Sequence, residues 1–308
     1  MNEYQPEGIS FNKGVAAEGG YTLPMLERAK ERGKILEAPV LLCDSDMNLH
    51  VSLGGITGII ARDEVVFPIG NESVKDIAIL TRVGKTVCFH VCGIERRGGR
   101  LVASLSRRSA QKECYLQKIS RLSPGDIVKA KVTHLESFGA FLDIGCGIVS
   151  LLPIDAISVS RISHPSVRLS VGDLIHVVIR SLSDERVYVS RKELLGSWEE
   201  NAALFHAGET VPGIVRSIEE YGIFVELTPN LTGLAEIKEG AVVNEGATVY
   251  IKSILPERMK IKLVILDYFK KPLPPNAPGV SFLSSETTHI DHWRYSPLCA
   301  EKTIETYF

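Results

Sequence analysis

The sequence lacks any apolar run approaching the roughly 20 residues that a membrane-spanning helix needs. Its first residues, 1–13, are polar and acidic and contain no apolar stretch of the kind that forms a secretory signal. Hydrophobic residues nevertheless make up 44% of the chain, which is enough to fill buried cores. We therefore expect a soluble, cytoplasmic protein with no membrane partner.

Cysteines are few and scattered. The six cysteines include no Cys-x-x-Cys pair and no spacing typical of a zinc site or a disulfide framework, so free thiols are expected. The residues that come closest to a metal-binding set are His289, His292 and Cys299, but their spacing is loose and a fourth ligand is lacking. We expect neither a metal ion nor a cofactor.

The motifs of common enzymes are also absent. No glycine pair is followed by a lysine-bearing phosphate loop, and neither a catalytic triad nor a nucleophile elbow is found. A metal-dependent nuclease would need a cluster of carboxylates beside the phosphate, and little chain remains outside the repeats described below to build one. The sequence therefore predicts a protein that is not an enzyme.

What the sequence does contain is an internal repeat. Residues 125–132 align with residues 208–215, so the second copy follows the first by 83 residues, and residues 138–143 match residues 221–226 at the same distance. Apolar and polar residues alternate within 128–133, which is typical of a half-buried strand. About five such strands in a short unit favour a closed barrel of the oligonucleotide-binding (OB) fold.

A fainter copy precedes these two and begins at Gly33. Segments 109–119 and 194–205 carry helix-forming residues and are expected to be linker helices, with Trp198 as a packing residue between modules. The predicted fold class is therefore all-β with linker helices, built as tandem five-stranded OB-fold barrels.

Each of the two clear copies carries a pair of aromatic residues three positions apart across a glycine: Phe138 with Phe141, and Tyr221 with Phe224. Residues three apart in a regular strand face opposite sides, but a bulge at the glycine would place both rings on the outer face. Two adjacent exposed rings form a stacking surface for bases, worth roughly 1–3 kcal/mol per base. A single strand aromatic more often packs in a core, but the recurrence of the pair favours the binding surface.

Residues 125–192 and 208–264 resemble the RNA-binding repeats of the ribosomal protein S1 family, and with the fainter copy the resemblance covers most of 33–268. The whole chain looks like a shortened, three-repeat member whose tail ends in Tyr307 and Phe308. The resemblance implies binding of single-stranded messenger RNA (mRNA) and tethering of it to the small ribosomal subunit.

The implied organisation has five parts. They are an N-terminal extension with a short helix (1–32), a degenerate OB-fold repeat plus linker helix (33–118), two RNA-binding repeats (119–196 and 197–270), and a proline-rich spacer and tail (271–308). The spacer is expected to be stiff because of Pro272, Pro274, Pro275 and Pro278.

In the family, RNA is contacted by two strand aromatics, a histidine and a basic residue near the end of the barrel. The histidine position falls near Pro153 and Glu236, so that contact is missing here, with His134 as a substitute ring. The predicted RNA-binding residues are Phe138, Phe141, Lys129, Lys131, His134, Arg186, Arg191, Lys192, Tyr221, Phe224, Arg216 and Lys260.

The copies are not equivalent. Acidic residues outnumber basic ones over 197–270, and Glu219 and Glu220 directly precede Tyr221, so repulsion of phosphate is expected to weaken binding there. The first copy lacks the aromatic pair and is expected to dock on ribosomal protein or the RNA backbone through Arg96, Arg97, Arg100, Arg107 and Arg108.

Two other functions remain open from the sequence. Net charge is −2 over the whole chain, which by itself does not indicate a nucleic-acid binder. The alternatives are an RNA-binding accessory factor in transcription or RNA decay, and a protein-docking adaptor with little affinity for RNA.

Overall fold

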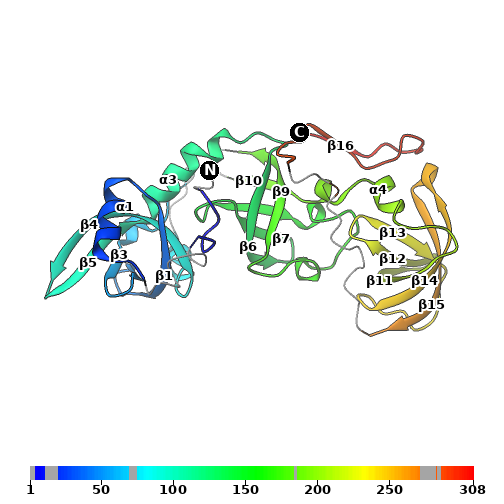
Figure 1. Cartoon of the computed structure of the whole chain (residues 1–308). Coiled ribbons are helices and arrows are strands. Elements are labelled where there is room, and N and C mark those ends of the chain that lie inside the picture. The colour runs from blue at the N-terminus through cyan, green and yellow to red at the C-terminus, as the bar shows by residue number, and fades with distance from the viewer. Residues whose placement is uncertain (1–3, 11–19, 69–74, 184–185, 271–281, 283–285) are drawn as a thin grey trace.

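Three closed five-stranded barrels follow one another along the chain (Figure 1). The computed structural model describes residues 4–10, 20–68, 75–183, 186–270, 282 and 286–308, and the predicted proline spacer lies outside them. The predicted fold class, tandem OB-fold barrels with linker helices, is confirmed. Within the described residues, no helix is both long and apolar enough to cross a membrane.

The three barrels share one strand order, in which the third strand pairs in parallel with the fifth. The first barrel consists of β1 (Leu36–Cys43), β2 (Leu49–Ser52), β3 (Thr57–Ile60), β4 (Thr86–Arg97) and β5 (Arg100–Ser106). The middle barrel consists of β6 (Ile127–Glu136), β7 (Gly139–Asp143), β8 (Val149–Pro153), β9 (Leu174–Leu182) and β10 (Val187–Ser190). The third barrel consists of β11 (Thr210–Glu219), β12 (Gly222–Thr228), β13 (Leu231–Ala235), β14 (Gly246–Leu255) and β15 (Lys260–Phe269).

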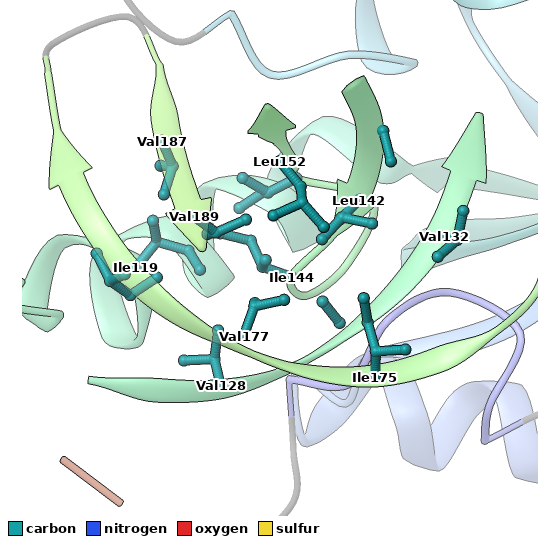
Figure 2. Close-up of a cluster of buried hydrophobic side chains, with 14 of the residues drawn as sticks. Ile119, Val128, Val132, Leu142, Ile144, Leu152, Ile175, Val177, Val187 and Val189 are labelled. Atoms are coloured by element: carbon teal, nitrogen blue, oxygen red, sulfur yellow. The ribbon is translucent and has the colours of Figure 1, made fainter. Parts of the chain in front are cut away.

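Alternating strand residues fill each barrel. In β6, Val128, Ala130 and Val132 are buried while Lys129 is exposed, as the two-residue period predicts. Figure 2 shows branched apolar side chains from β6 to β10 meeting in the interior of the middle barrel. Burial of this apolar surface is what stabilises so short a unit.

The linker helices lie close to their predicted positions. Helix α1 (Leu23–Glu31) and the short α2 (Asp76–Leu80) belong to the first barrel. Helix α3 (Arg107–Gln117) begins two residues before the predicted start, because the Ser106 hydroxyl accepts a hydrogen bond from the Ser109 amide. The second predicted helix is divided into a 3-10 turn (Lys192–Leu195) and α4 (Trp198–Ala202), separated by Gly196 in a left-handed conformation. Trp198 is buried in the core of the third barrel, as expected of a packing residue.

The tail, whose fold the sequence pattern does not predict, forms a hairpin of β16 (His292–Arg294) and β17 (Glu305–Tyr307). Before the hairpin, the Ile127 amide donates to the Thr288 carbonyl at 2.8 Å. After the first hairpin strand, the Trp198 amide donates to the Tyr295 carbonyl at 2.9 Å. The tail therefore contacts both the middle and the third barrel.

A buried carboxylate closes the junction between the first two barrels. Glu7, from the N-terminal segment, accepts hydrogen bonds from the Arg107 Nε at 2.7 Å and from the Cys88 amide of β4 at 3.0 Å. The Glu7 amide in turn donates to Asp143 of β7 at 2.7 Å. Residues 4–10 thus link the first barrel, α3 and the middle barrel.

A second buried carboxylate closes the junction between the middle and third barrels. Glu226 of β12 accepts hydrogen bonds from Arg168 of the middle barrel at 2.8 Å and from Arg216 of β11 at 2.6 Å. Burial alone would raise the pKa of Glu226, but the two guanidinium groups outweigh it, so the pKa lies below its usual range. The Asn230 side chain extends the contact by donating to the carbonyls of Lys192 and Gly196, both at 2.8 Å.

The substitution Glu226→Gln tests this junction. It leaves two buried guanidinium groups without a counter-charge, so we expect the free energy of unfolding to fall by roughly 3–5 kcal/mol. Urea denaturation followed by tryptophan fluorescence measures it, because Trp198 and Trp293 both pack on the third barrel. The exposed Glu219→Gln is the matched control, and equal losses in the two variants would contradict the role of Glu226.

The same ion pair gives a pH dependence. Because the folded pKa of Glu226 is lowered, its stabilisation is present above the unfolded value of about 4.3 and is lost as the pH falls through the folded pKa. Denaturation of the wild type and of Glu226→Gln at several pH values should therefore show their stabilities converging in acid. A difference that stays constant over that range would rule out titration of Glu226 as the cause.

Candidate nucleic-acid interface

The two rings of the middle barrel lie side by side on its outer surface. The Phe138 side chain is 54% exposed, and its ring centroid lies 6.0 Å from that of the partly exposed Phe141, with the ring planes at 88°. The imidazole of His134 stacks on the other side of Phe141 at 6.3 Å and 22°. We call Phe138, Phe141 and His134 the ring platform of the middle barrel.

The geometry that brings the rings together differs from the predicted bulge at Gly139. Strand β7 pairs regularly along its length, and the irregularity lies on β6 between Val132 and His134. Phe138 lies in the turn before β7, so it escapes the strand alternation altogether. Glycine is needed at 139 because a Cβ there would lie 2.4 Å from the Leu152 carbonyl oxygen.

The strand pairing extends this surface beyond the predicted residues. Phe141 pairs with Leu151 of β8, and Leu151 pairs with Tyr188 of β10, so the three side chains form a row on one face. Tyr188 is half-buried between the buried Val187 and Val189. Sequence alternation in β10 already marks Tyr188 as outward-facing, although it was not among the predicted contacts.

The third barrel repeats the ring geometry but not its neighbours. Tyr221 is 69% exposed and meets Phe224 at 6.0 Å and 88°. Pairing places Ser217 where the middle barrel has His134, and Lys262 where it has Tyr188. With Glu219 and Glu220 exposed beside Tyr221, this platform carries fewer rings and more negative charge.

Some of the predicted basic residues lie near the rings. Arg186 is exposed directly before β10, two residues before Tyr188. Lys260 is exposed two residues before Lys262 in β15 and lies on the ring-bearing face of the third barrel. The Lys131 Nζ donates to the Glu7 carbonyl at 2.8 Å and is therefore directed toward the N-terminal segment. Lys129 is exposed but pairs with His176 of β9, away from the row of rings.

Three other residues that were predicted to contact RNA are wholly or partly buried. Arg216 is wrong as an RNA contact, because its side chain is 5% exposed and is bound to Glu226. Arg191 lies mostly out of solvent at the second junction, where burial and the charge of Arg168 lower its pKa. Lys192 is half-buried, with its Nζ 3.4 Å from the Asp155 carbonyl.

Four of the five predicted docking arginines are exposed, and one is buried. Arg96, Arg97 and Arg100 are exposed at the tip of the β4–β5 hairpin, which projects from the end of the molecule (Figure 1). Arg108 is exposed, with its Nη1 3.3 Å from the Asp63 carbonyl. Arg107 is wrong as a docking residue, because it is 2% exposed and bound to Glu7.

In the first barrel, strand pairing puts His50 at the position of Phe141 and Leu42 at that of His134. The His50 Nε2 lies 3.0 Å from the Asp44 carboxylate, and this hydrogen bond is the main cause that lowers the Asp44 pKa to about 2. The first barrel thus has one imidazole held by an acid in place of two exposed rings, which agrees with the predicted absence of the pair.

Comparison with known families matches residues 121–192 to the S1 RNA binding domain. The small ribosomal subunit protein bS1 of Rhizobium meliloti is 28% identical over 224 residues, which are 70% of this chain and 38% of that protein. The bS1 protein of Leuconostoc lactis is 29% identical over 240 residues, which are 73% of this chain and 54% of that protein. The chain thus spans about half the length, or less, of these curated relatives.

Among solved structures, a multidomain protein with nucleic acid binding domains from Streptococcus pneumoniae is 14% identical with a TM-score of 0.25, over 76% of this chain and 73% of that chain. The matched family model is that of an RNA binding domain and the relatives are named as ribosomal proteins, which is consistent with the predicted lack of catalysis.

The two platforms differ in a way that titration can measure. We expect Phe138→Ala with Phe141→Ala to weaken oligonucleotide binding by roughly 1–3 kcal/mol for each base that stacks. Tyr221→Ala with Phe224→Ala should cost less, because the acidic surroundings already disfavour phosphate there. Both double variants are made in the full chain and titrated with labelled single-stranded RNA at low salt. Equal losses, or a larger loss in the third barrel, would contradict the predicted ranking.

Proposed function

We propose that this chain, which matches the S1 RNA binding domain over residues 121–192 and is similar to bS1 proteins, binds single-stranded mRNA and tethers it to the small ribosomal subunit. The observation that carries the proposal is the exposed pair of rings, repeated with the same 6.0 Å separation and 88° angle in two barrels. Adjacent exposed aromatic side chains are typical of surfaces that bind single-stranded nucleic acid, because every RNA base offers a flat face for stacking. The ribosomal relatives support a cytoplasmic location.

The proposed division of labour gives the middle barrel the main RNA contact. Its ring platform includes His134, Tyr188 lies in the same row as Phe141, and Arg186 is exposed two residues before Tyr188. The proposed docking contact of the first barrel is the tip of the β4–β5 hairpin, where Arg96, Arg97 and Arg100 are exposed. A function in transcription or RNA decay would use the same platform with different transcripts.

Crosslinking in cells separates these alternatives. Enrichment of messenger leaders and small-subunit ribosomal RNA is the result expected for a role in translation. Enrichment of nascent or decaying transcripts instead would overturn the tethering function while leaving RNA binding intact. The full chain is required, because residues 4–10 contact both the first and the middle barrel.

The hairpin tip gives a separate prediction. The triple substitution Arg96→Gln, Arg97→Gln and Arg100→Gln should reduce co-sedimentation with small ribosomal subunits, because it removes the exposed positive charge of the tip, while oligonucleotide affinity stays within about twofold. A matched control is Arg28→Gln, Lys30→Gln and Arg32→Gln, which removes three exposed charges near α1 of the same barrel. Equal co-sedimentation of the two triple variants would exclude the tip as the docking surface.

A further inference from the structure

A cavity of about 350 Å³ lies at the junction of the first and middle barrels. Arg82 and Lys85 line it from the first barrel, and Lys131 and Thr133 line it from β6 of the middle barrel. Its acidic lining residues are Glu7 and Asp143, both of which are buried.

The positive charge of the cavity is not fully neutralised by these acids. Glu7 is bound to Arg107, which does not line the cavity. Burial and, after it, the charge of Glu7 raise the pKa of Asp143. Arg82 approaches Glu7 only to 4.0 Å, and its buried Nε has no hydrogen-bond partner within the part of the chain that is described. Burial lowers the pKa of Lys85, and the charges of Arg82 and Lys131 lower it further, because the three cations lie close together. Such a group of cations favours an anion between them.

The cavity adjoins the ring platform. Strand pairing aligns Lys131, Asp143 and Val149 in one row across β6, β7 and β8. This row lies next to the row of His134, Phe141 and Leu151. Neighbouring outward positions on one strand are about 7 Å apart. The Thr133 hydroxyl, which also lines the cavity, donates to the Phe141 carbonyl at 3.0 Å. A base stacked on Phe141 would therefore lie one row of strand residues from the cavity.

The middle and third barrels carry no cation at the position that corresponds to Lys85 of the first barrel. One backbone hydrogen bond recurs in all three barrels. The amide of a first-strand valine donates to a carbonyl before the fourth strand: Val40 to Lys85, Val132 to Asp173 and Val215 to Glu245. Lysine at this position is thus replaced by an acid in the middle and third barrels. At the second junction, moreover, Glu226 binds both Arg168 and Arg216.

We propose that this cavity binds a backbone phosphate of the RNA strand that stacks on the middle barrel, with Arg82 and Lys85 as the principal donors and Lys131 at its edge. The proposal rests on the proposed function, since it needs RNA on the ring platform. It gives the first barrel a direct part in RNA binding, although that barrel lacks exposed rings. The junction then fixes the direction in which the strand leaves the platform.

The test is the salt dependence of RNA affinity in the full chain. For single strands, the logarithm of the affinity falls with the logarithm of the salt concentration by roughly 0.7 for each phosphate contact. Lys85→Gln and, separately, Arg82→Gln should each lower affinity at low salt and reduce this slope by about that amount. Lys85→Arg should retain the slope, and the exposed Lys112→Gln on α3 is the matched control for loss of one charge. Thermal unfolding checks that each variant is folded.

The outcomes separate this inference from the proposed function. A wild-type chain that binds no oligonucleotide would overturn both. Wild-type binding with the same slope in Lys85→Gln and Lys112→Gln would overturn the phosphate cavity alone. A parallel titration with inorganic phosphate and pyrophosphate distinguishes the source of the anion. If Lys85→Gln abolishes binding of these anions but leaves the salt dependence of RNA affinity unchanged, the cavity binds a free phosphate compound. That result would overturn the RNA contact.

Discussion

The arrangement of the three barrels depends on a buried carboxylate held by arginine at each junction. Glu7 with Arg107 closes the first junction, and Glu226 with Arg168 and Arg216 closes the second. A buried charge is costly unless it is paired and hydrogen-bonded, so each pair fixes the groups that surround it. Neighbouring barrels are therefore joined by specific contacts. The tail adds to the second junction, where the Tyr295 hydroxyl donates to the Asn230 carbonyl at 2.7 Å.

Fixed junctions give the ring platforms defined surroundings. The middle platform lies beside a junction whose cavity is lined by Arg82, Lys85 and Lys131, whereas the third lies beside Glu219 and Glu220. Two platforms with the same ring geometry thus have different charged neighbours. Under the proposed function, the cations beside the middle platform favour phosphate and Glu219 and Glu220 disfavour it, so RNA binding is expected to be stronger on the middle barrel.

The repeat and the two-residue alternation were sufficient to predict the barrels, and the recurrence of the aromatic pair was sufficient to predict that the rings are exposed. The roles of individual charged residues were not predictable in the same way. Arg107 and Arg216 look like surface arginines in the sequence, and only the fold shows that Glu7 and Glu226 bind them. Glu7 lies 100 positions before Arg107, a separation at which no local pattern connects two residues. The hairpin turn that exposes Phe138 was likewise mistaken for a strand bulge, because the sequence does not show where β6 ends.

The central claim is that single-stranded RNA lies on the middle barrel, across the row of Phe141, Leu151 and Tyr188. Photocrosslinking of the full chain to an oligonucleotide that carries 4-thiouridine, followed by identification of the crosslinked peptides, tests it most directly. The account predicts crosslinks that concentrate on the peptides containing Phe138, Phe141 and Tyr188, with fewer on those containing Tyr221 and Phe224. Crosslinks confined to the third barrel, or spread evenly over the surface, would contradict it.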